Sequence, residues 1–319
     1  MNLIQTQVAI KMIKDRFEAT LAKKLSLVRV SAPLFVTKAS GLNDELNGVE
    51  ETVSFSVAGE KVEIVQSLAK WKRYALAEYG FKMGTGLYTD MNAIRKDEAL
   101  DALHSLYVDQ WDWEKIISKE QRNIKTLFST VRKIYQAIVS VASFARKQWG
   151  FSYRLPPSIK MVSTTELVKA YPDLTPKQRE AAITKEYRAV FLYQIGYPVG
   201  KEGPHDGRAA DYDDWRLNGD ILLYDDAIEG PIELSSMGIR VDAESLVKQL
   251  EFKGESHKLE NPYCQKILAG ELPYTIGGGI GQSRLCMYYL QKKHIGEVQS
   301  SYWPAEMKAK LKEAGLEIL

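Results

Sequence analysis

The stretch Gly219-Asp-Ile-Leu-Leu-Tyr-Asp-Asp-Ala-Ile-Glu-Gly-Pro-Ile-Glu-Leu-Ser-Ser-Met-Gly-Ile-Arg240 decides the expected fold. Two strand-like segments, 219–224 and 231–241, flank a turn-prone run, which is the pattern of an antiparallel hairpin. A turn centred on Asp226 and Ala227 would place Asp220 directly opposite Glu233. Paired like charges are unfavourable unless something neutralises them, and Mg²⁺ would do so. Two exposed acids are the alternative.

The rest of the chain shows the same separation of hairpins from helical blocks. Strands are expected at 27–35, 53–57, 62–64, 86–94, 105–114 and 189–195. Helices are expected at 4–24, at 68–79, up to Trp149, after the capping boxes Ser163/Glu166 and Thr175/Gln178, and finally from Leu285. This arrangement favours an antiparallel α+β fold over a doubly wound parallel sheet. Since no linker-like segment divides the chain, residues 1–319 are expected to form a single domain.

Composition limits the class of protein. The 319 residues carry 43 Lys plus Arg and 41 Asp plus Glu, a net charge of +2, whereas binding to a phosphate backbone calls for a basic excess. No apolar run approaches the ~20 residues of a membrane-spanning helix. Two cysteines are too few for a disulfide scaffold. We therefore expect a soluble, cytoplasmic protein without nucleic-acid or membrane partners.

A glycine-rich segment offers a nucleotide-binding hypothesis. Gly277-Gly-Gly-Ile-Gly-Gln-Ser-Arg284 precedes a helical pattern. Glycines allow the backbone to approach a ligand closely, the helix start offers free N–H groups, and Arg284 supplies a planar cation. The segment is not the dinucleotide fingerprint, because Arg284 stands where its last glycine should be. A tight turn with a solvated arginine is the alternative.

The segment 105–114 carries a row of polar side chains. Strand alternation places Gln110, Asp112 and Glu114 on one face, opposite two tryptophans. An amide oxygen next to a carboxylate suits a ligand amine. A solvent-facing edge strand explains the same pattern.

Four further charged stretches suggest a binding site only when they are considered together. Arg240 could clamp a carboxylate bidentately. Two lysines, Lys70 and Lys72, begin a helix after Gln66-Ser67, and Arg95 precedes two acids and a loop that could brace a triphosphate. Solvated side chains are the alternative for each. On its own, the run 211–214 predicts a solvated acidic loop.

Together these residues resemble the class II aminoacyl-tRNA synthetase catalytic core. Arg95 is similar to the motif 2 arginine, and 277–284 is similar to motif 3. QSLAKWKR and ELSSMGIR are similar to aspartyl-tRNA synthetase segments that hold aspartate. The nearest resemblance is to the aspartate–ammonia ligase family, whose order of motifs is matched over nearly the whole chain by GLYTDM, YVDQWDWE, AYPDL, DYDDW, LNGDIL, ELSSMGIRVDA and IGGGIGQSRL. Gln66 departs from the histidine of some members.

The resemblance implies an antiparallel sheet flanked by helices, a homodimer, and the reaction of L-aspartate, ammonia and ATP to asparagine, AMP and pyrophosphate. It implies that Arg95 grips the α-phosphate and that Arg284 stacks on adenine or braces the γ-phosphate, near Gly279 and Gly281. Mg²⁺ would be held by Asp220 and Glu233. Lys72 and Arg240 would hold the β-carboxylate, with Ser67, Gln110 and Asp112 at the amino end. Asp44, Asp213, Ser235 and Ser236 would also line the site, and Asp44 or Asp213 would take the proton of ammonium.

Three alternatives to this family are weaker on the sequence. An aspartyl-tRNA synthetase would need an anticodon-reading module, for which the chain has no residues to spare. A non-catalytic amino-acid sensor could lose Arg95, Arg284 or a metal-binding acid, yet all are present. Glutamine-dependent synthesis would need an N-terminal nucleophilic cysteine. Ammonia is therefore the expected nitrogen source.

Overall fold

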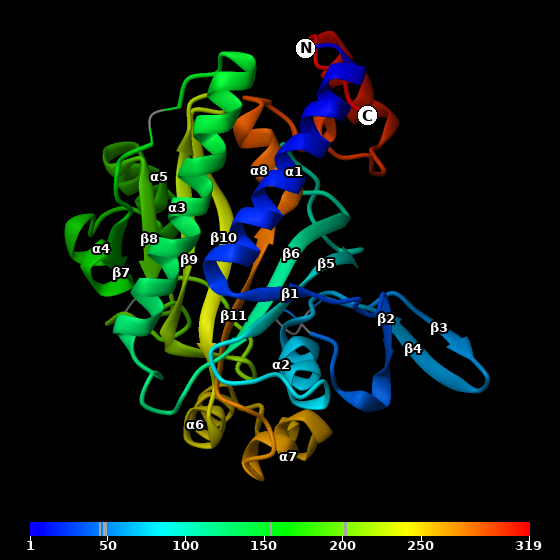
Figure 1. The fold of residues 1–319 in the computed structure, drawn as a ribbon, viewed down its shortest axis with the longest axis vertical. Helices are drawn as coiled ribbons and strands as arrows, with labels where there is room; N and C mark the ends of the chain where they lie inside the picture. Colours follow the sequence, from blue (N-terminus) through cyan, green and yellow to red (C-terminus); the bar gives the residue numbers. More distant parts are fainter. Residues whose placement is uncertain (45, 47–49, 154, 201–202) are drawn as a thin grey trace.

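The computed structural model describes residues 1–44, 46, 50–153, 155–200 and 203–319. Its main feature is a mixed eight-stranded sheet with the order β1-β5-β6-β11-β10-β9-β8-β7 (Figure 1). The central pairs are antiparallel, and the edge pairs β1·β5 and β7·β8 are parallel. The strands are β1 Leu27–Arg29, β5 Gly86–Ile94, β6 Tyr107–Ile116, β7 Lys160–Ser163, β8 Ala189–Tyr193, β9 Asp213–Asp225, β10 Gly230–Arg240 and β11 Thr275–Gly281. The expected α+β class is confirmed, and the two parallel edge pairs are an addition to it.

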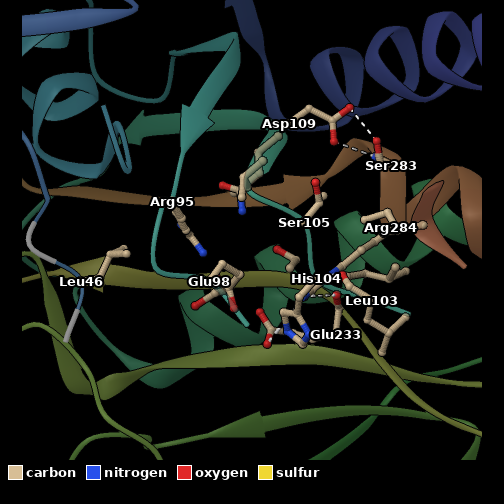
Figure 2. Close-up of a pocket in the computed structure, with 18 of the residues that line it drawn as sticks. Leu46, Arg95, Glu98, Leu103, His104, Ser105, Asp109, Glu233, Ser283 and Arg284 are labelled. Atoms are coloured by element: carbon tan, nitrogen blue, oxygen red, sulfur yellow. Dashed lines mark hydrogen bonds and ion pairs between the residues drawn. The ribbon is translucent and has the colours of Figure 1, made fainter. Parts of the chain in front are cut away.

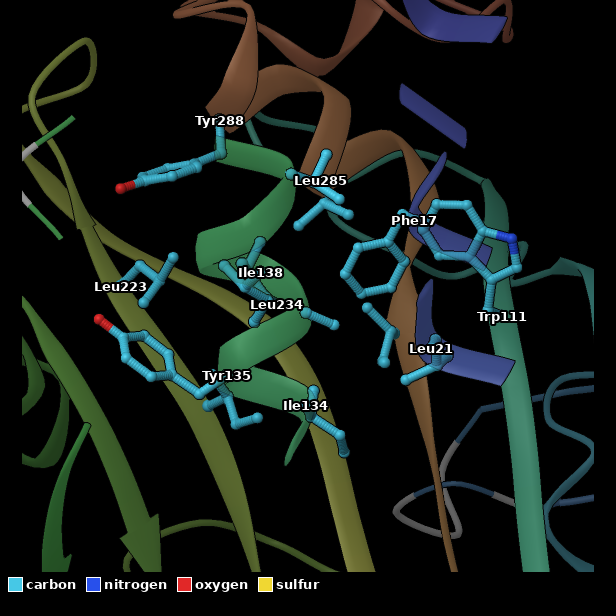
Figure 3. Packing of buried hydrophobic residues seen from close by; sticks show 14 of the residues in the cluster. Phe17, Leu21, Trp111, Ile134, Tyr135, Ile138, Leu223, Leu234, Leu285 and Tyr288 are labelled. Atoms are coloured by element: carbon cyan, nitrogen blue, oxygen red, sulfur yellow. The ribbon is translucent and has the colours of Figure 1, made fainter. Parts of the chain in front are cut away.

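One face of the sheet carries the main hydrophobic core. Helices α1 and α3 lie across this face together with α8, and Phe17 of α1 stacks near Trp111 of β6 with ring centroids 4.8 Å apart (Figure 3). Alternation along each strand supplies the apolar row, and the helices bury their own apolar stripes on it. The helices in the described chain are α1 Leu3–Leu25, α2 Ala69–Glu78, α3 Ile124–Trp149, α4 Thr164–Ala170, α5 Pro176–Tyr187, α6 Ala243–Lys253, α7 Pro262–Leu268, α8 Gln282–Tyr289 and α9 Ala305–Glu313.

Helices of the described chain cover the opposite face of the sheet at its two sides. Helix α2 packs against Leu87 and Met91 of β5, while α4 and α5 pack against Val190 and Leu192 of β8. Polar side chains and glycines occupy the strands between them. A smaller sheet, β2 Phe35–Thr37, β4 Glu60–Ile64 and β3 Ser54–Val57, projects beside α2 (Figure 1). The layering therefore leaves the middle of this face for a binding site.

Most predicted elements are confirmed, but β7, β11, α6 and α7 were not predicted, and other elements differ in their bounds. The segment 27–35 is not one strand but ends as β1 at Arg29, and β2 begins at Phe35 in the smaller sheet. The helix expected from Leu285 begins at Gln282, and α9 follows it as a further C-terminal helix. Both predicted capping boxes are present.

The predicted register of the β9–β10 hairpin is wrong. Asp225 pairs with Gly230, so the loop holds four residues, and a bulge between Glu233 and Ser235 shifts the pairing once more. Asp220 consequently lies opposite Ser236, and Glu233 lies opposite Leu222. A bulge adds one residue to one strand, which hydrophobic alternation alone does not reveal. Asp220 and Glu233 remain diagonal neighbours on one face.

No helix in the described part of the chain is long and apolar enough to cross a membrane.

Candidate active site

A cavity of about 380 Å³ opens on the middle of the polar face of the sheet. Strands β6, β10 and β11 form its base, while the β5–β6 connection and the segment before β9 form its walls. Figure 2 shows Arg95, Glu98, Glu233 and Arg284 gathered around it from separate parts of the chain. Its lining includes four cations, which are Arg95, Lys177, Arg208 and Arg284. The same lining includes five acids, which are Glu50, Glu98, Asp109, Asp206 and Glu233. Guanidinium groups among them could pair with the phosphates of a nucleotide.

The base of the cavity is organised by strand register. Asp112 of β6 pairs with Gly279 of β11, Gly279 pairs with Ser236 of β10, and Ser236 pairs with Asp220 of β9. Directly opposite residues share a face, so one polar row crosses four strands. The edge-strand interpretation of residues 105–114 is wrong, because β6 lies between β5 and β11.

The glycines of β11 make room for neighbouring side chains. A Cβ at Gly279 would lie 2.2 Å from Gln110 Oε1 and 2.6 Å from Asp112 Oδ1. A Cβ at Gly277 would lie 1.8 Å from Glu114 Oε2. None of these is a left-handed backbone position. The glycines are therefore required by the side chains that cross β11 toward the cavity.

A set of buried ion pairs lies beside the cavity, on the same face of the sheet as Gln110. Lys72 Nζ is 3.1 Å from Asp112 Oδ2 and donates to the Gly278 carbonyl at 3.0 Å. Arg240 donates to both oxygens of Glu114, at 2.9 Å from Nε and 2.7 Å from Nη2, and its Nη1 donates to Asp213. Burial alone would raise the pKa of Glu114, but Arg240 outweighs it and holds that pKa below its usual value. These ion pairs hold in place the side chains that, by the family resemblance, would bind the substrate aspartate.

A second buried cluster joins Asp44 to the segment before β9. Lys70 Nζ is 2.5 Å from Asp211 Oδ2, and both side chains are buried. Asp44 Oδ1 accepts the Leu46 N–H at 2.9 Å, while its buried Oδ2 has no partner among the described residues. Burial raises the pKa of Asp44, and Lys70 acts in the opposite direction.

The prediction of a solvated acidic loop at 211–214 is wrong. Asp211, Asp213 and Asp214 are all buried, and their ion-pair partners are Lys70, Arg240 and Arg122 respectively. Each of these three partners lies more than 25 positions away in the sequence, and Asp214 also contacts the nearby Arg216 at 3.5 Å. We predicted solvated acids because a short acidic run does not show which cations from distant segments will pack against it.

Asp220 lies at the end of the cavity nearest Arg208. Arg208 Nη2 donates to Asp220 Oδ2, and Asp220 Oδ1 is buried without a partner in the described chain. Burial raises the pKa of Asp220, and the nearby carboxylate of Glu233 adds to the increase. Burial also acts on Glu233, but Arg284 and Arg208 outweigh it and lower its pKa. Two carboxylates with an unsatisfied oxygen are the donor type that Mg²⁺ prefers, so these residues fit the ion.

Arg95 and Arg284 approach the cavity from two sides. Arg95 follows the last residue of β5, and its buried Nε has no partner in the described chain. Arg284 lies in the first turn of α8, where Nη1 donates to the Glu233 carbonyl at 3.1 Å and Nε donates to the Leu103 carbonyl at 3.4 Å. Both arginines therefore reach the cavity from fixed backbone positions.

The structure brings the predicted residues together in two shells. Those that line the cavity are Arg95, Gln110, Glu233, Ser235, Ser236, Gly279, Gly281 and Arg284. Those that stand beneath or beside it are Asp44, Ser67, Lys72, Asp112, Asp213, Asp220 and Arg240. Ser67 is less available to a substrate than expected, because its hydroxyl accepts the Ala69 N–H at the start of α2.

Sequence reasoning gave no role to several charged lining residues, among them Glu98, Lys177 and Arg208. Glu98 follows Arg95 closely, which could have indicated it. Lys177 lies near the start of α5, and Arg208 lies in a segment without periodicity. No local pattern marks the last two, because their position depends on how α5 and the segment before β9 fold over the sheet.

The family model described as aspartate–ammonia ligase matches residues 4–315. The chain belongs to this family. It is 56% identical to the aspartate–ammonia ligase of Bacillus cytotoxicus, covering 100% of this chain and 98% of that protein. It is 54% identical to the enzyme of Clostridium perfringens, covering 100% and 96%. The family expected from the motifs is confirmed, and the protein is an enzyme of the aspartate–ammonia ligase family.

Solved structures agree with the expected fold. The chain resembles asparaginyl-tRNA synthetase of Pyrococcus horikoshii complexed with asparaginyl-adenylate, with TM-score 0.66 and 18% identity over 94% of this chain and 70% of that one. The aspartyl-tRNA synthetase of Entamoeba histolytica gives TM-score 0.63 and 17% identity over 92% and 58%. At these identities the likeness shows the fold. This aspartate–ammonia ligase family member therefore has the class II synthetase architecture.

Proposed function

We propose that this protein synthesises L-asparagine from L-aspartate, ammonia and ATP, through a β-aspartyl adenylate that releases pyrophosphate and then AMP. The observation that carries the proposal is one cavity with Arg95 and Arg284 at its walls and Gln110 and Ser236 at its base, beside the Lys72–Asp112 and Arg240–Glu114 pairs. Family membership supports the same reaction. Adenylation is needed because a carboxylate is a poor electrophile.

The cations of the cavity support the adenylation step. Arg95 would bind the α-phosphate and the charge that develops on it, a contribution commonly worth several kcal/mol. Arg284 would stack on adenine or brace the γ-phosphate, next to Gly279 and Gly281. Asp220 and Glu233 would hold Mg²⁺, which when bound would neutralise phosphate charge and orient the nucleotide.

The buried ion pairs support recognition of aspartate. Of the five N–H donors of Arg240, the described contacts use Nε, one on Nη1 and one on Nη2, so two remain for a substrate carboxylate. Lys72 likewise has three donors, and two go to Asp112 and the Gly278 carbonyl. These donors would hold the β-carboxylate, while Gln110, Asp112 and Ser67 would stabilise the α-amino end and Ser235 and Ser236 would complete the site. Holding both ends is positioning catalysis.

Asp44 and Asp213 remain the two candidates for attracting ammonium and taking its proton. Both carboxyls are buried, and burial raises the pKa of each. Asp213 Oδ1 is engaged by Arg240, whereas Asp44 Oδ2 is unpartnered in the described chain. This difference favours Asp44 as the base.

The test is a product balance. The purified protein is incubated with aspartate, ATP and Mg²⁺, with and without ammonium, and asparagine, AMP and pyrophosphate are quantified. Equal amounts of all three, dependent on ammonium, are expected; ADP with phosphate, or no asparagine, would overturn the proposal. Asp44→Asn should reduce asparagine formation more than aspartate-dependent pyrophosphate exchange, whereas the exposed control Asp15→Asn should leave both unchanged. Equal losses in both assays would exclude Asp44 as the base.

The remaining expectations belong to the same proposal. We expect a homodimer acting in the cytoplasm without nucleic acid. Light scattering of the purified protein tests the dimer, and a monomer would contradict it. Addition of tRNA should leave asparagine formation unchanged.

A further inference from the structure

Arg208 occupies one of the two oxygens of Asp220. Arg208 Nη2 donates to Asp220 Oδ2, and the two side chains are 17% and 8% exposed. Asp220 Oδ1 is buried and unpartnered in the described chain. Asp220 therefore has one oxygen held by an internal cation and a second, buried oxygen that makes no hydrogen bond of normal geometry in the described chain, although the neighbouring Ser236 hydroxyl acts to lower the pKa of Asp220.

The two carboxylates of Asp220 and Glu233 need a nearby cation to offset their negative charge. Asp220 and Glu233 extend from neighbouring strands on the same face, and each carboxylate makes the other's charge less favourable. Arg208 acts on both carboxylates, and Lys177 acts on Glu233 from α5. Asp206 adds a further acid beside Arg208, 3.7 Å from its Nη1. Arg284 is the cation that acts most strongly on Glu233, so removing Arg208 without a replacement would deprive Asp220, rather than Glu233, of the cation that it contacts.

The backbone around Arg208 is held firmly, whereas its side chain is long. The carbonyl of Arg208 accepts from Lys253 Nζ at 3.3 Å. The carbonyl of Ala209 accepts from Trp215 Nε1 at 3.0 Å, and that of Ala210 accepts from Gln249 Nε2 at 3.0 Å. A change of partner at Asp220 is therefore available to the guanidinium by side-chain rotation, without breaking these anchors.

We propose that Arg208 is the counter-cation of the Asp220–Glu233 pair while no nucleotide is bound, and that it leaves Asp220 when ATP brings a divalent cation. The inference rests on the proposed function, because it needs ATP as the ligand. Since Arg208 lines the cavity with Arg95 and Arg284, the released guanidinium faces the phosphates. The exchange makes metal binding dependent on nucleotide, so that the pair does not take up a divalent cation alone.

The test measures metal binding directly, with Mn²⁺ as the probe and electron paramagnetic resonance as the readout, in the absence of nucleotide. The wild-type protein should bind Mn²⁺ weakly. Arg208→Met, which removes the charge and keeps much of the side-chain length, should lower the Kd for Mn²⁺ about tenfold or more, because a full charge is removed from a poorly solvated site. The double variant Arg208→Met/Asp220→Asn should lose this gain.

Two controls keep the test decisive. Arg216→Met removes an arginine whose side chain is 55% exposed and lies outside the cavity, so its Mn²⁺ affinity should equal that of wild type. Arg208→Lys keeps a charge on a more hydrated group and should give an intermediate Kd; it supplies the comparison if Arg208→Met does not fold. Equal Kd values for wild type and the Arg208 variants, or a gain that survives Asp220→Asn, would overturn the proposal.

The Mn²⁺-binding assay and the product assay can contradict their two proposals independently. Tighter Mn²⁺ binding by Arg208→Met without any asparagine synthesis by wild type would overturn the proposed function and leave the counter-cation in place. Asparagine synthesis with unchanged Mn²⁺ binding would do the reverse.

Discussion

Replacing Gly279 by alanine should damage aspartate recognition while leaving the fold intact. The added Cβ would lie 2.2 Å from Gln110 Oε1 and 2.6 Å from Asp112 Oδ1, whereas ordinary contacts begin near 3.4 Å. Both side chains must therefore move by roughly 1 Å, and a displacement of that size can cost on the order of 10²-fold in rate. Gln110 is a flexible side chain at the cavity, so the accompanying loss of folding free energy should be only about 1–3 kcal/mol.

The neighbouring glycines of β11 supply matched variants. A Cβ at Gly281 would meet only carbons of the Arg284 side chain, at 3.3 Å and beyond, so Gly281→Ala should keep nearly wild-type kcat/KM for aspartate. A Cβ at Gly278 would lie 2.6 Å from the Ser236 carbonyl, which is backbone, so Gly278→Ala should lower Tm most. Steady-state kinetics with aspartate varied at saturating ATP, together with thermal unfolding, measure these effects. Undiminished kcat/KM in Gly279→Ala, or an equal loss in Gly281→Ala, would refute the steric reasoning.

Three further outcomes are expected. Arg95→Gln should reduce aspartate-dependent pyrophosphate exchange at least about 10²-fold, since it removes charge stabilisation from the phosphate; unchanged exchange would contradict the role of Arg95. Glu114→Gln should lower the free energy of unfolding by about 3 kcal/mol in urea, because buried Arg240 loses a charged partner; a loss below about 1 kcal/mol would argue against a tight pair. Asp225 is buried, and burial raises its pKa to about 6 from 3.8, so its ionisation destabilises the fold above about pH 6 and costs nothing below about pH 4. Asp225→Asn should therefore be more stable than wild type at pH 8, by up to about 3 kcal/mol, and equal to it at pH 4; a difference independent of pH would exclude this cause.

Local sequence patterns predicted the elements well where one side of the element is apolar. The segment 86–94 and the long helix ending at Trp149 emerge as expected, and the capping boxes at Ser163 and Thr175 mark helix starts. The patterns failed at the β9–β10 register and at the length of the first strand. In these places a bulge or a change of sheet decides the outcome, and neither leaves a periodic signal.

The residues of the candidate site also fall into those that the sequence indicated and those that it did not. The motifs indicated the residues that line the base and walls, including Gln110, Gly279 and Arg284. They contained Lys70 but did not indicate that it pairs with Asp211, and they did not indicate Lys177 or Arg208, which reach the cavity from a helix and a non-periodic segment. Ion pairs between distant segments depend on the folded arrangement, because the sequence around a charged residue does not show whether its side chain will be solvated or paired.

The sequence by itself determined the family, the α+β class and some of the residues that line the cavity, because dense ordered motifs and hydrophobic periodicity are local properties of the chain. Only the tertiary structure decided that Asp220 faces Ser236 rather than Glu233 and that Arg208 neutralises it. It also decided that the aspartates of 211–214 are buried with cationic partners. Register, burial and charge pairing are set by which segments pack together, and that information lies in the contacts between them.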